Sequence, residues 1–415
     1  MRIAYLVSRF PAVSETFVLR ELDAVAAAPD VEVVLHSLFP AQDESIVHPA
    51  AQPWSERLWR ARPGAGAAAL AWWLVRRPGR TLAVVGAVAR DYASVPRVLP
   101  RALATIPLAA AHARRFQDER VEHVHAHFAT YPALAAWIAW RLTGVPYSFT
   151  AHAHDLFIHQ AMLARKAADA AFVVAISHYN ERFLLERAGP RRPQVHVVHC
   201  GVHPDHFAFR VRRLEPGRAP VIACVAALRP PKGHAVLLRA LAGAPAPLAD
   251  ARLELVGDGP LRAELETLAR TLGIAGRVRF HGSLPEEAVA VLLADADLFV
   301  LPSVIAADGD MEGVPVALME ALAAGLPAVA TRQSGVPELI RDGVSGYLAE
   351  PGDVASLRAA MLEALGETDL EERARAGREL VEREFDQLRS ARRLLELFQA
   401  ASRSGESATD GAISS

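Results

Sequence analysis

Short apolar runs rich in β-branched residues alternate along the chain with longer stretches of alanine, leucine and arginine that have a helical period. This alternation is typical of parallel βα units, in which a helix follows each strand and covers the sheet. We therefore predict an α/β protein in which one parallel-sheet architecture occurs twice. The pattern predicts six strands in each half, at residues 2–8, 31–38, 123–128, 147–152, 171–177 and 195–201, then at 221–228, 252–257, 278–281, 298–302, 328–331 and 346–349.

The point at which the strand pattern restarts predicts a domain boundary. Residues 210–220 are polar, contain proline and glycine and have little periodicity, so we place the interdomain linker there. This gives an N-terminal domain at 1–208 and a C-terminal domain at 219–384. After a helical segment at about 379–398, residues 402–415 are rich in serine, glycine and alanine and are predicted to be a disordered tail.

Composition narrows the class of protein without identifying it. With 415 residues and 52% hydrophobic side chains, the chain can fill two hydrophobic cores, and a net charge of −2 gives no overall attraction to nucleic acid. Cys200 and Cys224 are the only cysteines, too few for a disulfide framework. No window reaches the roughly 18 consecutive apolar residues of a membrane span, and the N-terminal apolar run is too short for a secretory signal. We expect a cytoplasmic protein, soluble or peripheral.

Residues 54–115 differ in character from the rest of the chain. Eleven arginines and two acidic residues are interleaved there with aromatic residues such as Trp59, Trp72, Trp73 and Tyr92. A basic, aromatic, amphipathic stretch can lie on an anionic membrane surface or receive an anionic acceptor. Ordinary helices with solvated arginines are the alternative. Peripheral contact with the cytoplasmic face of the inner membrane is therefore a hypothesis.

The most informative stretch is 312–320, Glu-Gly-Val-Pro-Val-Ala-Leu-Met-Glu. Pro315 suits the first turn of a helix, because it has no N–H group to leave unpaired there. Glu320 then lies inside an otherwise apolar helix, where a carboxylate needs a partner. Glu312 lies just before the helix, beside exposed N–H groups that suit an anion or a hydroxyl-rich ligand. A capping glutamate and a surface glutamate are the structural alternative.

Two further segments of the second half follow predicted strands. Lys232 comes after the strand at 221–228, and the carboxyl ends of parallel strands are where doubly wound domains bind ligands. An ammonium group beside helix N–H groups suits a diphosphate, although a solvated lysine at a helix start is the alternative. Gly257-Asp258-Gly259-Pro260 ends the next strand. Its glycines permit close approach of a ligand, but the sequence is also common in turns.

In the first half, the segment 150–155, Thr-Ala-His-Ala-His-Asp, ends a predicted strand. His125 and His127 lie two residues apart on an adjacent strand, so both point to one face, where a place in the core or a cleft wall is favoured over catalysis. A phosphate-adjacent loop is expected after the first strand. That loop contains Arg9, Ser14, Glu15 and Thr16.

Taken together, these segments resemble a known family. The stretch 312–348, with Ser-Gly-Val-Pro-Glu-Leu at 334–339 and Gly-Val-Ser-Gly-Tyr-Leu at 343–348, resembles the C-terminal signature of the family 4 retaining glycosyltransferases. Ser-Glu-Thr-Phe-Val at 14–18 is similar to the branch that builds bacterial exopolysaccharides, including colanic-acid-type enzymes. The resemblance spans most of the chain. It implies the GT-B fold, two Rossmann-like domains facing a central cleft, with a C-terminal helix at about 385–400 that crosses back onto the first domain.

The resemblance also implies an activity. It is the transfer of a sugar from a nucleotide diphosphate sugar, of UDP or GDP type, to a saccharide or lipid-linked saccharide with retention at the anomeric carbon, in exopolysaccharide or cell-surface glycan biosynthesis. The N-terminal domain would bind the acceptor and the C-terminal domain the donor, with no obligatory metal or other cofactor. The resemblance implies His152 and Glu312 as catalytic residues. The donor-binding residues that it implies are Arg229, Lys232, Gly257, Asp258, Gly313, Val314, Pro315 and Glu320.

The chain departs from the family pattern at several positions. Ala227 stands where an arginine is usual, and Arg229 is the nearest residue that can supply the missing charge. Ser-Arg-Phe-Pro at 8–11 replaces a glycine-rich turn. Cys200 and His203 stand where asparagine and aspartate are usual.

Four alternatives stay open. His152 and His154 have the spacing to offer two imidazoles to one ion, as in a metal-dependent hydrolase. Asp-Gly-Asp at 308–310 matches the metal-binding motif of the single-domain GT-A class. The missing arginine at Ala227 is compatible with a non-catalytic protein that binds sugar nucleotides, and a glycosyltransferase of specialised metabolism is the fourth. An NAD-dependent dehydrogenase is excluded, because no Gly-x-Gly-x-x-Gly follows a predicted strand.

Overall fold

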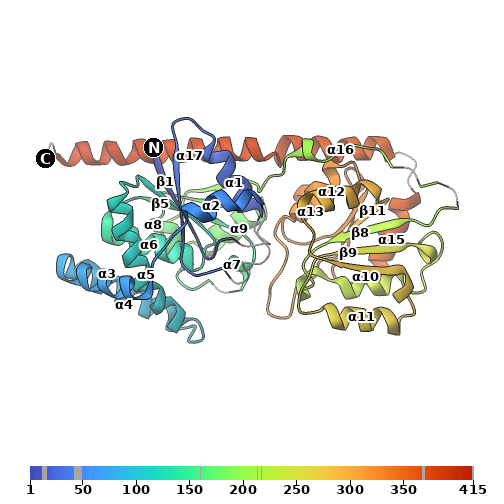
Figure 1. The fold of residues 1–415 in the computed structure, drawn as a ribbon, viewed down its shortest axis with the longest axis horizontal. Helices are drawn as coiled ribbons and strands as arrows, with labels where there is room; N and C mark the ends of the chain where they lie inside the picture. Colours follow the sequence, from blue (N-terminus) through green and yellow to red (C-terminus); the bar gives the residue numbers. More distant parts are fainter. Residues whose placement is uncertain are drawn as a thin grey trace. The chain divides into compact units, whose positions relative to one another are not determined.

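The computed structural model describes residues 1–11, 16–41, 49–158, 160–212, 214–215, 217–366 and 370–413. The chain divides into two compact units (Figure 1). The first unit consists of Met1–Val198 and Ser390–Ser415, and the second of His199–Arg389. Each is built on one parallel sheet with helices on its faces, so the predicted repetition of a parallel α/β architecture is confirmed.

The first unit contains a seven-stranded parallel sheet in the order β3-β2-β1-β4-β5-β6-β7. Its strand order reverses between β1 and β4. All six predicted strands are present, whereas the two-residue β3, which pairs with the end of β2, was not predicted because two residues have no period. The strands are β1 Arg2–Val7, β2 Glu32–Ser37, β3 Trp59–Arg60, β4 His123–His127, β5 Tyr147–Ala151, β6 Phe172–Ala175 and β7 Val195–Val197.

The basic stretch 54–115 is mainly helical. Trp73 is buried, and its indole nitrogen donates to the carbonyl of Ala110 at 3.0 Å. The guanidinium groups of Arg76 and Arg114 lie 4.8 and 4.7 Å from the ring centre of Trp72. The helices of the first unit before its last are α1 Thr16–Ala26, α2 Gln52–Arg57, α3 Pro63–Arg76, α4 Pro78–Tyr92, α5 Leu99–Asp118, α6 Tyr131–Thr143, α7 His154–Phe157, α8 Leu163–Asp169 and α9 His178–Arg187.

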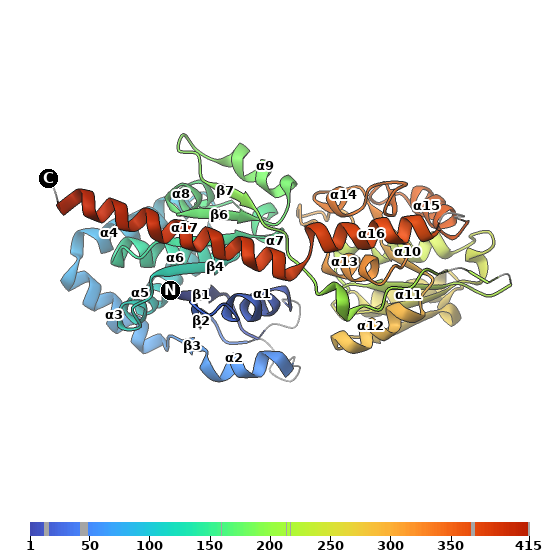
Figure 2. The same ribbon diagram turned by 90° about the horizontal axis from the view of Figure 1, so that it is seen from above.

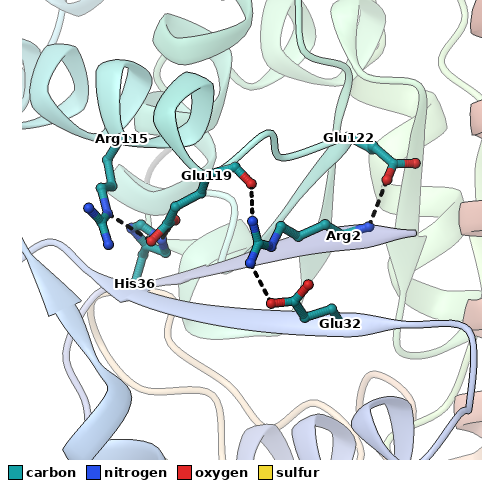
Figure 3. A network of polar contacts seen from close by, with 6 residues as sticks. All are labelled: Arg2, Glu32, His36, Arg115, Glu119 and Glu122. Carbon is teal, nitrogen blue, oxygen red and sulfur yellow. Dashed lines mark hydrogen bonds and ion pairs between the residues drawn. The ribbon is translucent and has the colours of Figure 1, made fainter.

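A polar network joins the start of β1 to β2 and to the end of α5 (Figure 3). The Arg2 guanidinium donates to Glu32 at 2.5 Å and to the carbonyl oxygen of Glu119, and its backbone N–H donates to Glu122 at 3.0 Å. The carboxylate of Glu119 in turn accepts from Arg115 at 2.7 Å and lies 3.1 Å from His36 Nε2. Helix α5 is thereby fixed to the amino end of β1.

The last helix, α17 Gln387–Ile413, belongs to the first unit from Ser390 onward and crosses its sheet (Figure 2). Phe398 is fully buried, and its ring centre lies 5.2 Å from that of His125 and 5.7 Å from that of Phe172. The helix continues to Ile413, through most of the segment that composition predicts to be a disordered tail. Extending an existing helix by further residues costs little free energy, and composition alone does not predict this extension.

The second unit contains a six-stranded parallel sheet in the order β10-β9-β8-β11-β12-β13. Its order reverses between β8 and β11, and all six strands coincide with predicted ones. They are β8 Val221–Val225, β9 Arg252–Val256, β10 Val278–Gly282, β11 Leu298–Leu301, β12 Ala328–Thr331 and β13 Tyr347–Ala349. The helices are α10 His234–Leu241, α11 Arg262–Thr271, α12 Glu286–Asp295, α13 Val316–Ala323, α14 Val336–Leu339, α15 Val354–Gly366 and α16 Leu370–Glu384.

Both faces of this sheet are covered by helices, which requires nearly continuous apolar strands. Ile222 and Cys224 of β8 pack with α10, α11 and α15, and Ala223 packs with α12, α13 and α16 on the other face (Figure 1). Burial raises the pKa of the Cys224 thiol to about 12. Successive side chains of a strand therefore pack alternately into two cores, one on each face of the sheet.

The predicted linker at 210–220 differs from the division of the structure, which falls before His199. Val202 and Phe207 are buried in a core of the second unit. The buried Arg212 guanidinium donates to the carbonyls of Leu293, at 3.1 Å, and Ala324. The linker was predicted from the polarity of this segment alone. Part of that polarity is Arg212, whose guanidinium forms hydrogen bonds with buried carbonyl groups.

Among the described residues, no helix combines the length and the apolarity that crossing a membrane requires.

Replacing Phe398 by alanine is expected to destabilise the first unit by about 3–5 kcal/mol, because it removes a buried ring from the core beneath α17. Gln399→Ala, at an exposed position on the same helix, is the control and should change stability by less than about 0.5 kcal/mol. Chemical denaturation followed by circular dichroism measures both. Equal effects of the two substitutions would show that α17 does not contribute to that core.

Candidate functional site

The predicted site residues of the second unit gather where its strand order reverses. Strands β8 and β11 are neighbours there, and the crevice outside the carboxyl ends of such strands is where doubly wound domains bind ligands. Lys232 follows β8 and Glu312 follows β11. The ammonium group of Lys232 donates to Oε2 of Glu312, and the two form an ion pair. Lys232, predicted to bind the diphosphate, and Glu312, predicted to bind the sugar, therefore form one charged pair.

Gly233 lets the loops after β8 and β11 lie in contact. The short helical turn Pro230–Lys232 ends at this glycine, whose φ of +67° is in the left-handed region. A Cβ atom at 233 would lie 1.8 Å from the carbonyl oxygen of Pro302. The N–H of Val304 donates to the carbonyl of Pro231 at 2.9 Å. The backbone thus brings Lys232 to Glu312.

Three hydroxyl residues that the sequence analysis did not select hold the Glu312 segment. Ser303 Oγ lies 3.4 Å from the Glu312 carboxylate, and Thr331 Oγ1 donates to the carbonyl of Ser303 at 2.6 Å. Ser334 Oγ donates to the carbonyls of Glu312 and, at 3.1 Å, Gly313. The sequence could have indicated them by their position, because all three lie at the end of β11 or β12 or shortly after it. Ser334 is also the first residue of the signature segment at 334–339.

The ion pair remains within reach of a ligand. The Lys232 side chain is 24% exposed and that of Glu312 is 11% exposed. A largely buried ion pair gives little net stability, because the cost of removing both charges from water offsets their attraction, so this pair is better placed to bind an anion or a hydroxyl than to stabilise the fold. An anion that approaches Lys232 would compete with Glu312 for its three donors.

Helix α13 begins beside this pair, one residue later than predicted. Pro315 is its N-cap, and the carbonyl of Pro315 accepts from the N–H of Leu318 at 3.1 Å. Gly313 and Val314 precede it and are buried. Glu320 lies within the helix, as predicted, and is buried among the core residues of this face. The N-terminus of α13 adds partial positive charge near Glu312.

The other donor-binding candidates lie at the same edge but outside the ion pair. Arg229 is exposed, and its side chain has no hydrogen bond or ion pair within the described part of the chain. Gly257 has a φ of +128°, and a Cβ atom there would lie 2.1 Å from the carbonyl oxygen of Ala226. This glycine is therefore needed for contact between the loops after β8 and β9. Asp258 is exposed and forms a 3.7 Å ion pair with Arg262.

In the first unit, His152 follows β5 and is held on several sides. Its Nε2 lies 3.2 Å from Nδ1 of His127. Its backbone N–H donates to Asp155 at 3.0 Å, and its carbonyl accepts from the side chain of Asn180. Burial, and then the neighbouring His127, lower the pKa of His152 well below its usual value, so the ring is neutral near pH 7. Asp155 has a structural task here, since its carboxylate also accepts from the N–H of Ala129 at 2.6 Å.

The buried residues His125 and His127 of β4 form a polar group with Glu21 of α1, whose side chain is 23% exposed and which the sequence analysis did not select. Its carboxylate accepts from the hydroxyl of Tyr5 at 3.0 Å, and Oε1 lies 3.2 Å from His127 Nε2. His125 is also buried, with its ring nitrogens 2.8 and 3.0 Å from the hydroxyls of Ser148 and Thr150. The predicted common face of His125 and His127 is confirmed, since both rings contact Tyr5.

Among the described residues, the one cluster of three or more potential metal ligands is Glu21, His125 and His127. It contains neither His152 nor His154, the pair of the hydrolase alternative, and His154 is exposed at the start of α7. The polar atoms of the cluster already have hydrogen-bond partners in the protein. Asp308 and Asp310 lie in a loop after β11 and are outside the cluster.

The loop after β1 is described only in part. Arg9 donates to the carbonyl of Pro40 at 2.5 Å, and its guanidinium lies 5.7 Å from the ring centre of Phe39. Thr16 is the first residue of α1. The candidates Ser14 and Glu15 lie outside the described residues.

Lys166 is the other lysine of the chain and is almost fully buried in α8. Its ammonium donates to the carbonyl of Ala129, the residue whose N–H is bound by Asp155. Burial lowers the pKa of Lys166 to about 7, and the Asp155 carboxylate acts in the opposite direction. A basic residue in the chain's apolar interior was not predicted, because its burial depends on the packing of α8.

The models of two known protein families match this chain. A family described as "Glycosyltransferase Family 4" matches residues 72–206, and one described as "Glycosyl transferases group 1" matches residues 205–380. The amylovoran biosynthesis glycosyltransferase AmsK of Erwinia amylovora is 36% identical over 249 residues, which are 59% of this chain and 60% of that protein. The chain thus spans less than two thirds of this relative.

Two further comparisons cover more of the partner's length. The GDP-mannose-dependent alpha-(1-6)-phosphatidylinositol monomannoside mannosyltransferase of Mycolicibacterium smegmatis is 31% identical over 275 residues, 63% of this chain and 72% of that protein. The structure of Anabaena HepE in complex with UDP-glucose superposes with a TM-score of 0.71 at 18% identity, and the match covers 96% of this chain and 100% of that one. That likeness concerns the fold, and the predicted GT-B class is confirmed.

Replacing Lys166 by methionine is expected to stabilise the protein by about 1–4 kcal/mol at pH 7. The unfolded chain keeps this proton up to about pH 10.5, while the folded chain releases it near pH 7. The destabilisation by Lys166 is therefore full below pH 7 and declines as the pH rises towards 10.5. Denaturant unfolding of both proteins at pH 7 and pH 9.5 should show a smaller difference at pH 9.5. A difference that is independent of pH would contradict this assignment.

Proposed function

We propose, from the premise that this chain belongs to glycosyltransferase family 4, that it transfers a sugar from a nucleotide diphosphate sugar to a hydroxyl group of an acceptor. The observation that carries the proposal is the Lys232–Glu312 pair at the switch point of the second sheet. This is the edge at which an α/β sheet binds a nucleotide, and the pair offers one cation and one hydrogen-bond acceptor to it.

The proposed chemistry assigns a task to each of these groups. The bond between the anomeric carbon and the diphosphate oxygen breaks, and negative charge grows on the leaving diphosphate. Lys232 offsets that charge, as a preorganised donor does, and the N-terminus of α13 adds to it. Glu312 accepts hydrogen bonds from the hydroxyls of the sugar and orients it. The oxygen of the acceptor hydroxyl forms the new bond to the anomeric carbon, and its proton passes to the departing diphosphate oxygen; we propose that the anomeric configuration is retained.

The remaining donor residues are proposed by position. Glu320 would accept from the ribose hydroxyls, and Gly257 and Asp258 would lie beside the base. Arg229, exposed and without a partner in the described part of the chain, is free to turn towards the diphosphate in place of the arginine missing at Ala227. From the first unit, His152 would contact the sugar. The scheme needs no metal ion.

The relatives support a choice of donor and acceptor class. HepE was solved with UDP-glucose, and the mycobacterial relative is named for GDP-mannose, so we propose a UDP- or GDP-sugar donor. AmsK is named for amylovoran biosynthesis, and the mannosyltransferase for a phosphatidylinositol mannoside. We accordingly propose a saccharide or lipid-linked saccharide acceptor, and a place in exopolysaccharide or cell-surface glycan biosynthesis in the cytoplasm.

A membrane-bound acceptor would favour attachment of the first unit to the lipid surface. On α3 and α4, Val75 is 83% exposed and Leu82 is 62% exposed. Arg76, Arg77 and Arg80 lie between them in the sequence. We propose that this surface, residues 75–82, rests on anionic lipid, with the apolar side chains in the interface and the arginines at the headgroups.

Donor binding is tested by thermal unfolding with UDP-, GDP- and ADP-sugars and the free nucleotides. One of the UDP or GDP series should raise the melting temperature by a few degrees at saturating concentration. Lys232→Ala should weaken that nucleotide about 10- to 100-fold, because a charged hydrogen bond is lost. Arg252→Ala, an exposed arginine at the amino end of the same sheet, should not. A protein that responds to none of these nucleotides is not a transferase of this kind.

Glu312→Gln separates binding from turnover in the same experiment. The substitution removes the carboxylate that occupies Lys232, so free UDP or GDP should bind at least as tightly as to the wild type. Hydrolysis of the donor sugar without an acceptor should fall by about 100-fold or more, because the sugar loses its orienting group. Turnover that is unchanged would exclude Glu312, and donor binding without any turnover in the wild type would favour the non-catalytic alternative.

Lipid attachment is tested by sedimentation with vesicles of phosphatidylglycerol and phosphatidylcholine at physiological salt. The double variant Val75→Glu and Leu82→Glu should bind about tenfold or more weakly, since it loses apolar contact and adds negative charge. Val291→Glu, at a position 64% exposed in the second unit, is the control. Wild-type protein that stays in the supernatant at this salt concentration would refute the attachment.

A further inference from the structure

We propose that Glu21 and His127 are positioning residues that fix the ring tautomer of His152, so that its Nδ1 atom accepts a hydrogen bond from a hydroxyl of the sugar. The inference rests on the proposed function, in which His152 contacts the donor. Glu21, His127 and His152 are called the relay below. They come from three different elements: α1, β4 and the loop after β5.

The relay is continuous in space. Oε1 of Glu21 lies 3.2 Å from Nε2 of His127, and Nδ1 of His127 lies 3.2 Å from Nε2 of His152. His127 and His152 are both buried, and their rings are stacked with their centres 5.5 Å apart. Each distance is within hydrogen-bond range, so a proton lies between each pair of atoms.

The chemistry of the groups decides which atom holds each proton. An ionised carboxylate only accepts, and Oε1 of Glu21 already accepts from the Tyr5 hydroxyl at 3.0 Å. Nε2 of His127 must then be the donor towards Glu21. A neutral imidazole has one N–H, so Nδ1 of His127 is an acceptor, and its neighbour His152 Nε2 must donate to it. His152 is thereby left with an unprotonated Nδ1.

The unprotonated Nδ1 atom determines which group of the substrate His152 can bind. A lone pair accepts from a sugar hydroxyl, whereas it would repel an oxygen of the departing diphosphate. Within the described residues, Nδ1 of His152 has no partner in the protein. The geometry thus selects the sugar hydroxyl over the phosphate as the partner of His152.

The ring has little freedom to leave this arrangement. It lies against Phe17 and Phe128, with centres 4.8 and 4.7 Å away. Its backbone is bound by Asp155 and Asn180. A group fixed in this way does not need to be ordered when the substrate binds.

The tautomer can be measured directly on the full chain. Nitrogen-15 NMR of the histidine-labelled protein separates protonated from unprotonated ring nitrogens, and His127→Gln and His152→Gln variants assign the signals. At pH 7.5 we expect both residues to hold the proton on Nε2. Glu21→Leu should change the His152 signals, while Glu21→Gln, whose amide oxygen still accepts, should largely preserve them. A proton on Nδ1 of His152, or a doubly protonated ring, would overturn the proposal.

Kinetics then distinguish a positioning role from a structural one. His127→Phe should lower the turnover number for donor hydrolysis about 10- to 100-fold and leave the KM for the donor within about threefold. His123→Phe is the matched control, since His123 is a buried histidine of the same strand that contacts Ser148 and not His152. It should change neither constant more than about threefold. Equal losses in the two variants would contradict the relay.

Two further outcomes keep this inference separate from the proposed function. If the tautomer is as predicted but His152→Ala leaves donor hydrolysis unchanged, the relay exists and the task proposed for His152 is wrong. If His152→Ala abolishes hydrolysis but the proton is on Nδ1, the function stands and the relay is wrong. A stoichiometric metal ion in the purified protein, lost in His125→Gln, would also overturn the relay, because the ion would occupy the nitrogen that must donate to Glu21.

Discussion

The ion pair between Lys232 and Glu312 is the constraint on which the site of the second unit depends. The two residues are 80 positions apart, and they meet because β8 and β11 are neighbours in the sheet. The contact also requires that the two loops touch, which only a glycine at 233 permits. Three serine and threonine hydroxyls then hold the backbone around Glu312. The order of the strands, the contact between the two loops and the hydrogen bonds of the hydroxyl groups thus all position Lys232 and Glu312.

The first unit uses the same physical arrangement with different chemistry. Its strand order reverses between β1 and β4, and Glu21, from the helix after β1, meets His127 at the end of β4. Here the histidine is fully buried, and a chain of hydrogen bonds from Glu21 through His127 to His152 takes the place of the ion pair. In each unit a polar pair thus lies where the strand order of the sheet reverses.

The sequence was sufficient for the architecture and for single residues, but not for their partners. Every predicted strand is present because apolar alternation reflects burial on a sheet, and only the two-residue β3 was missed. Lys232 and Glu312 could each be selected from their place after a strand. Their contact could not, since it depends on strand order. Glu21 and Lys166 were missed for the same reason: nothing in their local sequence shows that a fold will bring a carboxylate to two histidines or enclose an ammonium group.

The central claim is that Lys232 is held by Glu312 until a diphosphate takes its place. The most direct measurement is a crystal structure of the full chain with UDP or GDP bound. The account predicts a diphosphate oxygen within hydrogen-bond distance of Lys232 Nζ, with the nucleoside extending over the carboxyl ends of β8 and β11. A nucleotide bound elsewhere, with Lys232 still bonded to Glu312 alone, would contradict it.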